Sequence, residues 1–279
     1  MYKIGDFIFD VKIHGVPTPV NLDKFYYKGN ETPYLYEIIK VDKVEIKESS
    51  IDIKQDEICI VKNGKYEKRY LFIPGDATPY ALCEEVDDNK TVIYLDRKYT
   101  SEIVNDVMFV SLLSLEKRLH KYNQYILHSA YILHSGQAIL FTGPSGIGKS
   151  TQADLWDKYK DIKIINGDRS VLTEKDGKIY ACGCSYCGTS QYCENVSAPV
   201  KAIVILEQSY NNEIKKAAYK ETVKDLFKQI TINYYNEKFF NDALDFIDAI
   251  IENTNVYLLK CNISKEAVDV LYNRLFNVH

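Results

Sequence analysis

Residues 143–151 place three glycines, a lysine and two consecutive hydroxyl residues in the order Gly-Pro-Ser-Gly-Ile-Gly-Lys-Ser-Thr. This order fits G-x-x-x-x-G-K-[S/T], in which glycines let successive backbone N–H groups turn towards phosphate oxygens. The lysine of such a loop reaches the β- and γ-phosphates, and the hydroxyl after it ligates Mg²⁺. The pattern therefore predicts a Walker A loop that binds ATP and Mg²⁺. The residues expected at the nucleotide are Gly143, Pro144, Ser145, Gly146, Ile147, Gly148, Lys149, Ser150 and Thr151, with Ser150 also on the metal.

The segments on either side of the loop support this prediction. Ala138–Thr142 is an apolar run that predicts a strand, and the residues after the loop, through Leu155 and Trp156, predict a helix. A helix that begins at the loop adds the positive end of its dipole to the phosphate site. Switches and motors use the same loop as kinases, so the loop predicts nucleotide binding and leaves the reaction to other residues.

A carboxylate is needed near such a loop, because an acidic residue at the end of a neighbouring strand holds Mg²⁺ or activates the nucleophile. Asp168 follows the run Ile164–Gly167 and is the candidate for the metal ligand and for the catalytic role. The alternative is an ordinary turn carboxylate. Asp154 and Asp157 fall inside the predicted helix, and we interpret them as part of its solvated face.

Residues 124–210 resemble the C-terminal catalytic domain of bacterial HPr serine kinase/phosphorylase and smaller kinase-like relatives from peptide-modification gene clusters. The resemblance rests on three features in order: the pair Leu127-His128 on a strand, the loop GPSGIGKST, and Asn166-Gly167-Asp168-Arg169. It implies a compact P-loop kinase fold related to phosphoenolpyruvate carboxykinase. It also implies transfer of the γ-phosphoryl group of ATP to a serine of a peptide or small protein, and it allows a homo-oligomer.

Two positions depart from that family. Gly167 stands where the family carries the first aspartate of an Asp-Asp-Arg element, and Thr151 stands where the HPr enzymes carry glutamate. Both differences indicate a relative with another substrate. The resemblance therefore extends to the kinase class and not to HPr itself or to the reverse, phosphate-releasing activity.

Three further side chains are considered for the site. Two of them, His128 and Arg169, have both a functional and a structural interpretation, and His134 has a structural one. His128 can orient the nucleophile or stabilise transferring charge near the γ-phosphate, or it can be a hydrogen-bonded strand residue. Arg169 can pair with phosphate through its planar guanidinium, or it can tie Asp168 to the sheet. His134 falls in the predicted turn before Ala138–Thr142, and we expect it to be structural.

The segment 182–193 gathers four of the seven cysteines with the spacing C-x-C-x₂-C-x₅-C. Zinc sites more often use two separated C-x₂-C pairs, and no histidine lies nearby, so reduced structural thiols are favoured over a metal site. In the related kinase-like proteins a glycine-rich segment of the type G-x-x-x-x-G-[T/S]-S occupies this place. Gly183–Ser190 resembles it and could close over nucleotide or substrate.

The strand and helix patterns predict two domains in an α/β (α+β) protein. Residues 1–100 show short β-type runs and form a smaller β-rich domain, and residues 101–123 form a connecting helix. Residues 124–279 form a catalytic domain of the HPr kinase/phosphoenolpyruvate carboxykinase type. Its expected helices over 222–235 and 237–253, strand over 256–259 and helix from Ser264 complete the chain.

Composition narrows the classes of function. The net charge is −4 and the basic residues form no block, so a nucleic-acid partner is not expected. Charged residues interrupt the apolar residues of the N-terminus and no long apolar segment follows, so we expect a cytoplasmic protein without a membrane partner. The leading hypothesis is a serine kinase, and a nucleotide-gated binding module and a small-molecule kinase are the alternatives.

Overall fold

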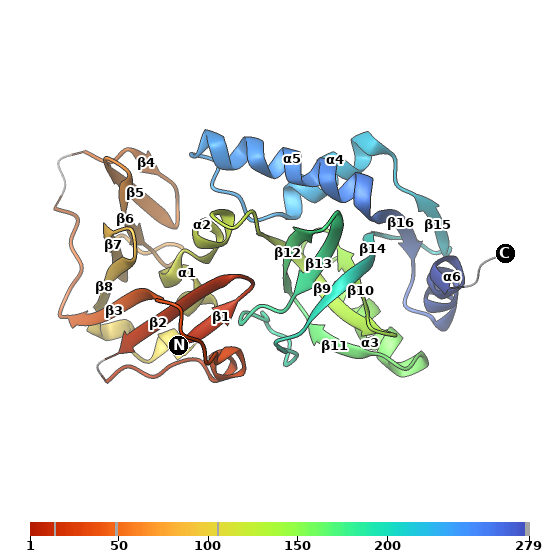
Figure 1. Ribbon diagram of the computed structural model, residues 1–279, viewed down its shortest axis with the longest axis horizontal. Coiled ribbons are helices and arrows are strands. Elements are labelled where there is room, and N and C mark those ends of the chain that lie inside the picture. Colours follow the sequence, from red (N-terminus) through yellow and green to blue (C-terminus); the bar gives the residue numbers. More distant parts are fainter. Residues whose placement is uncertain (14, 48–49, 105, 277–279) are drawn as a thin grey trace. The chain divides into compact units, whose positions relative to one another are not determined.

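The structure is a computed structural model that describes residues 1–13, 15–47, 50–104 and 106–276 (Figure 1). The chain divides into two compact units, residues 1–115 and 116–279. It is a mixed α/β protein with one eight-stranded sheet in each unit. Across the described residues, no helix is both long and apolar enough to cross a membrane.

The N-terminal unit is built on a mixed sheet. Its strands are β1 (Tyr2–Ile4), β2 (Phe7–Ile13), β3 (Tyr34–Val41), β4 (Ile53–Lys54), β5 (Ile58–Asn63), β6 (Tyr66–Leu71), β7 (Ala81–Asp87) and β8 (Lys90–Asp96), and the short helices η1 (Val20–Phe25) and η2 (Arg97–Tyr99) connect them. The strand order is β1-β2-β3-β8-β7-β6-β5-β4. β3 pairs in parallel with both β2 and β8, whereas the other neighbours are antiparallel.

Aromatic side chains at alternate positions of β2 and β3 form the core of this unit. The rings of Phe7 and Phe9 stack with centroids 5.2 Å apart, and those of Tyr34 and Tyr36 lie 5.0 Å apart. Alternation with a period of two places them on one face of the sheet. The hydroxyl of Tyr36 donates a hydrogen bond of 2.6 Å to the carbonyl of Leu113, which ties the end of α1 (Asp106–Leu113) to the sheet.

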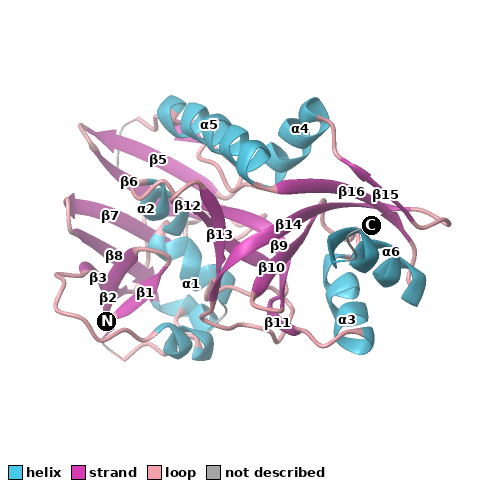
Figure 2. Ribbon diagram, turned by 45° about the vertical axis from the view of Figure 1, so that its right-hand side comes forward, coloured by secondary structure: helices cyan, strands magenta, loops and turns pink. Residues whose placement is uncertain are grey.

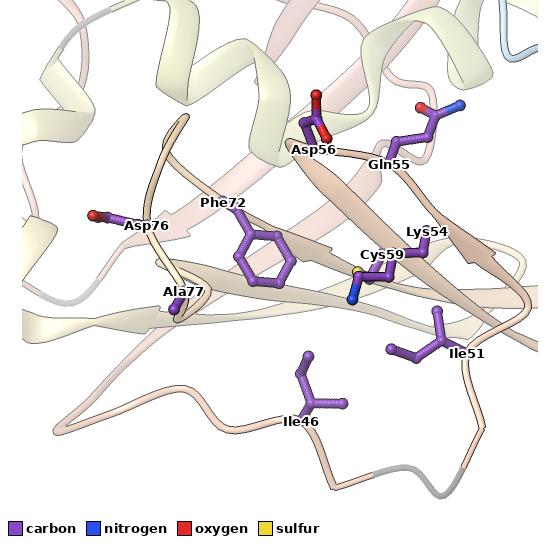
Figure 3. Close-up of a pocket in the computed structure, with 9 residues that line it drawn as sticks. All are labelled: Ile46, Ile51, Lys54, Gln55, Asp56, Cys59, Phe72, Asp76 and Ala77. Atoms are coloured by element: carbon purple, nitrogen blue, oxygen red, sulfur yellow. The ribbon is translucent and has the colours of Figure 1, made fainter.

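A cavity of about 410 Å³ lies beside β4 and β5 in the same unit (Figure 3). One of its carboxylates, that of Asp76, already accepts a hydrogen bond from the hydroxyl of Tyr99. The cavity belongs to the N-terminal unit and includes no residue of the predicted phosphate loop. The lining residues are Ile46, Ile51, Lys54, Gln55, Asp56, Cys59, Phe72, Asp76 and Ala77.

The connecting helix predicted over residues 101–123 is divided in the structure. The short helix η3 (Glu102–Val104) precedes α1, α2 (Leu115–His120) follows it, and residue 105 lies outside the described residues. Ser114 separates α1 from α2 with a φ of 49°. A left-handed residue cannot continue a right-handed helix, so the regular apolar spacing of this segment conceals a break.

The C-terminal unit contains a sheet that closes on itself and carries an open extension. Its strands are β9 (Tyr125–His134), β10 (Gln137–Thr142), β11 (Lys163–Asn166), β12 (Arg169–Lys175), β13 (Lys178–Cys182), β14 (Ser197–Gln208), β15 (Glu213–Lys216) and β16 (Asn255–Cys261). β9, β10, β14, β13 and β12 pair in a ring, and β11 pairs with β9. β10, β14 and β16 run parallel, so their carboxyl ends meet at one edge.

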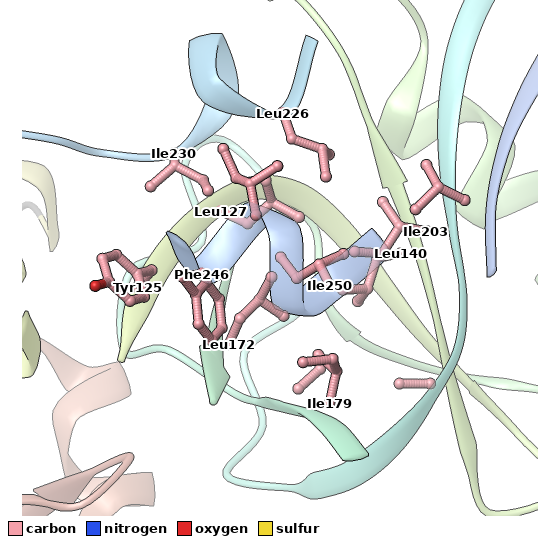
Figure 4. Packing of buried hydrophobic residues seen from close by; sticks show 14 of the residues in the cluster. Tyr125, Leu127, Leu140, Leu172, Ile179, Ile203, Leu226, Ile230, Phe246 and Ile250 are labelled. Carbon is pink, nitrogen blue, oxygen red and sulfur yellow. The ribbon is translucent and has the colours of Figure 1, made fainter. Parts of the chain in front are cut away.

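Helices cover both faces of this sheet (Figure 2). They are α3 (Lys149–Tyr159) and α6 (Lys265–Phe276) on one face, and α4 (Tyr219–Gln229) and α5 (Glu237–Asn253) on the other. β10 shows the alternation: Phe141 belongs to the cluster that contains Trp156 of α3, whereas Leu140 belongs to the cluster on the other face and lies beside Ile250 of α5 (Figure 4). Each such buried side chain stabilises the fold by about 1.5–3 kcal/mol relative to an exposed one.

Two elements of this unit differ from the sequence prediction. The helix expected over 222–235 ends at Gln229, because Ile230 bridges to β9 and the N–H of Thr231 donates to the carbonyl of Ile126 at 2.9 Å. The strand β15 was not predicted. Its sequence, Glu-Ile-Lys-Lys, lacks an apolar pattern, and backbone pairing with β16 forms it at the sheet edge.

Candidate phosphate-transfer site

The predicted phosphate loop connects β10 to α3, at the edge where the parallel strands end. Gly143, Gly146 and Gly148 have φ values of 144°, 77° and 109°, a region that residues with side chains rarely adopt. A Cβ at 146 or 148 would meet no atom within 4 Å. Backbone conformation therefore explains these two glycines, and close packing does not. The other loop residues, Pro144 and Ser145, are exposed.

Lys149 is the first residue of α3 and folds back onto the loop. Its ammonium donates to the carbonyls of Gly143 at 3.0 Å and Pro144 at 3.1 Å, and only 6% of the residue is exposed. Burial lowers the pKa of Lys149, and the negative charge of Asp168 opposes that effect.

Hydrogen bonds between strands position Asp168 beside the loop. Arg169, at the start of β12, pairs in register with His128 of β9, and the N–H of Ser129 donates to the carbonyl of Asp168 at 2.9 Å. β9 also pairs with β10, whose last residue, Thr142, donates its hydroxyl to the carbonyl of His128 at 2.8 Å. β9 thus holds Asp168 on one side and the strand that enters the loop on the other.

The two carboxylate oxygens of Asp168 differ in their hydrogen bonding. Nε2 of His128 lies 3.2 Å from Oδ1, and Nε of Arg169 lies 3.1 Å from Oδ2. Oδ2 is buried, yet it accepts no hydrogen bond within the described residues, because Arg169 is not aligned to donate one. Burial raises the pKa of Asp168, but the hydrogen bond from His128 and the charges of Arg169 and Lys149 outweigh it and lower the pKa. Asp168 is therefore ionised at neutral pH.

Asn166 organises the turn that carries Asp168. It is fully buried, and its Oδ1 accepts the N–H groups of Asp168 at 2.8 Å and Arg169 at 2.9 Å. Its Nδ2 donates to the carbonyls of Cys184 and Tyr186, both at 2.9 Å. One carboxamide thus fixes the Asp168 turn and also holds the cysteine-rich segment against it.

The segment Gly183–Ser190 lies over Asp168. A Cβ at Gly188 would come within 3.1 Å of both Cβ and Cγ of Asp168. The guanidinium of Arg169 lies 5.5 Å from the centre of the Tyr186 ring, within the range of a cation–π contact. Arg169 thus contacts both the carboxylate and the covering segment, which agrees with its interpretation as a residue that ties Asp168 in place.

The cysteines of this segment take part in the fold. Cys184, Cys187 and Cys193 are buried. The thiol of Cys193 donates to the carbonyl of Cys184 at 3.3 Å, and that of Cys187 donates to the carbonyl of Ser190 at 3.0 Å. In the part of the chain that the structure describes, no group of three or more His, Cys, Asp or Glu residues is placed to hold a metal ion.

Gly167 occupies a position where a side chain does not fit. A Cβ at this residue would lie 2.2 Å from Oγ and 2.3 Å from Cβ of Ser190. An aspartate therefore cannot stand at this position unless Ser190 moves. Asp168 is the carboxylate that this turn offers to the loop.

The remaining predicted residues lie where the loop becomes a helix. Ser150 is exposed and Thr151 is half-buried in the first turn of α3, and Ile147 packs against the core beneath the loop. Asp154 and Asp157 are exposed, as expected for a solvated face. His134 ends β9, where its Nδ1 lies 2.8 Å from a backbone carbonyl and its ring packs among aromatic side chains.

Two residues of the site were not predicted from the sequence. Asn166 was assigned no role, and Gln208 was not considered. Nε2 of Gln208, the last residue of β14, donates to the carbonyls of Gly146 at 3.3 Å and Ile147 at 3.4 Å. Its place directly after an apolar strand that neighbours the loop strand is the signal that could have identified it.

The residues present fit a nucleotide-bound Mg²⁺. Mg²⁺ uses one or two protein oxygens together with phosphates and water. The hydroxyl of Ser150, an exposed residue, and Oδ2 of Asp168, which accepts no hydrogen bond within the described residues, are the two oxygen ligands that the site offers. At Gly146 and Gly148 the position that a Cβ would take is open space.

Comparisons with known proteins find similarity among solved structures alone. No family model matches the sequence, and no curated protein matches it. Among solved structures, the HPr(Ser) kinase/phosphatase from Coxiella burnetii matches with a TM-score of 0.33 and 13% identity, over 53% of this chain and 95% of that chain. What this chain does is therefore inferred from the residues of its own site.

Proposed function

We propose that the C-terminal unit is an ATP- and Mg²⁺-dependent kinase that transfers the γ-phosphoryl group to a serine hydroxyl of a peptide or small protein. The observation that carries the proposal is the ionised Asp168, with its unused Oδ2, held beside a phosphate loop that contains Lys149. The ordered resemblance of the pair Leu127-His128, the loop and the Asp168 turn supports a fold of the HPr kinase/phosphoenolpyruvate carboxykinase type.

Each residue has a defined task in this reaction. The backbone N–H groups of the loop and the ammonium of Lys149 bind the β- and γ-phosphates, and Ser150 and Asp168 are the oxygens that would hold Mg²⁺. The bound ion neutralises charge on the phosphates. The acceptor hydroxyl loses its proton to the carboxylate of Asp168 as its oxygen bonds to the γ-phosphorus. The bond between that phosphorus and the bridging oxygen breaks, and ADP leaves.

His128 and Arg169 act on this carboxylate rather than on phosphate. His128 donates to Oδ1, which leaves Oδ2 for the metal or the acceptor, and both side chains lower the pKa of Asp168. His128 is thus a positioning residue in the proposed mechanism. A general base with a lowered pKa is weak but fully ionised, which suits a reaction in which metal and charge stabilisation dominate.

The test is a transfer assay with γ-labelled ATP and Mg²⁺ against a serine-containing peptide library, using the full chain. We expect label on serine. Lys149→Ala should abolish nucleotide binding and transfer, whereas Asp168→Asn should keep nucleotide binding and slow transfer by about 10²–10⁴-fold. Asp157→Asn, an exposed change on α3, is the matched control.

The same assay separates this proposal from its alternatives. Nucleotide binding without transfer to any peptide would overturn the kinase proposal and favour a nucleotide-gated binding module. Label on small hydroxyl compounds alone would contradict the proposal of a peptide acceptor, while the proposal of phosphoryl transfer would stand. Transfer that survives Asp168→Asn unchanged would remove Asp168 from the mechanism.

A further inference from the structure

The direction in which a nucleotide lies on the loop follows from the topology, provided that the proposed function holds. β10 lies between β9 and β14. Asp168 stands on the β9 side, so the γ-phosphate belongs there. The α-phosphate, ribose and base must then extend along the opposite part of the edge, where β14 and β16 end. Ligands of open parallel sheets bind outside the carboxyl ends of the strands.

The strand register shows which residues lie along that part of the edge. Thr142, the last residue of β10, is level with Ile205 of β14 and Leu258 of β16. Both β14 and β16 continue beyond this level, to Gln208 and Cys261. The chain segments after these two strands therefore stand beside the phosphate loop.

Two short segments, residues 209–212 after β14 and 262–264 after β16, are joined by hydrogen bonds at this place. Asn262 is central: its N–H donates to Oδ1 of Asn212 at 3.0 Å, and its Nδ2 donates to the carbonyl of Tyr210 at 2.8 Å. Its Oδ1 is buried and accepts no hydrogen bond within the described residues. The carboxamide is thus fixed through its donor, with its acceptor unused.

Gln152 of α3 reaches the same place from the other side. It is 3% exposed, and its Nε2 donates to Sγ of Cys261 at 3.3 Å and to the carbonyl of Asn262 at 3.2 Å. Its Oε1, like Oδ1 of Asn262, is buried and has no partner within the described residues. Buried polar atoms in folded proteins almost always find a partner, so two unused acceptors in one cluster indicate a site for a donor.

The chain segments that carry this cluster also carry exposed large side chains. Tyr210 is 97% exposed and Ile263 is 77% exposed. Both belong to the segments that Asn262 joins, and they lie beyond the end of the sheet core. Flat heteroaromatic rings bind between such side chains, because every nucleobase has two apolar faces.

We propose that Asn262, Tyr210 and Ile263 form the nucleobase subsite of this chain, and that it selects adenine. Oδ1 of Asn262 would accept a hydrogen bond from the exocyclic amino group, while Tyr210 and Ile263 cover the faces of the base. Gln152 is a positioning residue that holds the main chain of Asn262. Because Oδ1 lies below the surface, the amino group reaches it only after the atoms that cover it move.

The test compares dissociation constants of the full chain, with Mg²⁺, for ATP, inosine triphosphate and inorganic tripolyphosphate. Inosine triphosphate has the same sugar and phosphates but carries a carbonyl oxygen in place of the amino group. We expect ATP to bind the unchanged chain about tenfold or more tightly than inosine triphosphate. Asn262→Leu should abolish this difference and leave the binding of tripolyphosphate as it was.

Tyr210→Ala should weaken both nucleotides by about tenfold without affecting tripolyphosphate. Tyr234→Ala, at an exposed tyrosine between α4 and α5, is the matched control. Equal affinity of the unchanged chain for all three ligands would overturn the subsite and leave the phosphate loop intact. Failure of tripolyphosphate itself to bind would overturn both the subsite and the proposed function.

Discussion

The backbone of Gly188 lies against the side chain of Asp168, so that a Cβ on Gly188 would approach Cβ and Cγ of the aspartate to 3.1 Å. Gly188 has a φ of 60°, which also favours glycine. The segment Gly183–Ser190 therefore covers one side of the carboxylate. An acceptor hydroxyl must reach Asp168 from the uncovered side or displace this segment.

Gly188→Ala should impair transfer more than it impairs folding. The positive φ costs about 1–2 kcal/mol of stability, and the new methyl group pushes on Asp168. A displacement of about 1 Å at a catalytic carboxylate is expected to slow transfer by about 10²-fold, with nucleotide binding little changed. Steady-state kinetics and thermal unfolding of the same sample measure the two effects separately.

Gly177→Ala is the matched control for this change. Gly177 has a φ of 66° in the turn between β12 and β13, and a Cβ there would meet no atom within 4 Å. It should lose a similar amount of stability and keep full activity. Equal loss of activity in both variants would show that the contact between Gly188 and Asp168 has no role in the reaction.

Gly167→Ala should destabilise the protein because the new methyl group clashes with Ser190. Its Cβ would lie 2.2 Å from Oγ of Ser190, and overpacking of this kind costs about 1–3 kcal/mol. Ser190→Gly removes the clashing atoms, so the double variant should recover most of the loss. A double-mutant cycle in urea measures this coupling. Additive effects of the two changes would mean that Ser190 does not exclude a side chain at position 167.

The phosphate loop could be predicted from sequence because everything that defines it is local. The motif is recognised from the spacing of its residues Gly143, Gly146, Gly148, Lys149 and Ser150. The strand before the loop and the helix after it have clear apolar patterns. The short β-type runs expected in residues 1–100 were inferred on the same basis. These features depend on backbone conformation and on periodic burial, which a single chain segment expresses by itself.

The surroundings of Asp168 could not be predicted, because they depend on contacts between separate segments. The sequence gives no sign that the carboxamide of Asn166 donates hydrogen bonds to the carbonyls of Cys184 and Tyr186. The break at Ser114 was also missed, because the apolar spacing continues on both sides of this serine and gives no sign of its φ of 49°. Contacts between separate segments, and not propensity, position Asp168.

His128→Phe should move the acid limb of the pH–rate profile to higher pH. In the native chain the hydrogen bond and charge of His128 help to lower the pKa of Asp168, although burial raises it. Removing them raises that pKa, so Asp168 takes up a proton at a higher pH and transfer fails earlier on acidification. His128→Gln, which can still donate, should shift the limb less.

The same change has a consequence for stability with a defined sign. Because the folded pKa of Asp168 is lowered, its ionised form stabilises the fold above the unfolded pKa, and this contribution is lost as the pH falls through the folded pKa. His128→Phe should therefore lower the free energy of unfolding at neutral pH, and the difference from the native chain should shrink in acid. A difference that grows in acid would contradict this linkage.

Asn166→Asp should release the segment that covers Asp168 while leaving the phosphate loop in place. The change keeps the shape of the side chain and the acceptor for the N–H groups of Asp168 and Arg169. It loses the two donors to Cys184 and Tyr186 and sets a buried carboxylate oxygen against their carbonyls. Unpaired buried groups cost about 1–3 kcal/mol each, and charge adds to this cost.

Amide hydrogen exchange should then rise across residues 183–192 and remain unchanged across 143–151, with denaturation reporting the loss of stability. Asn253→Asp is the matched control, because its Nδ2 donates a single exposed hydrogen bond to the carbonyl of Ala249. If residues 183–192 keep their protection in Asn166→Asp, the carboxamide is not what holds this segment, and the packing of the buried Cys184 and Cys187 must hold it instead. A rise in both variants would show a general effect of added negative charge and not the loss of these two hydrogen bonds.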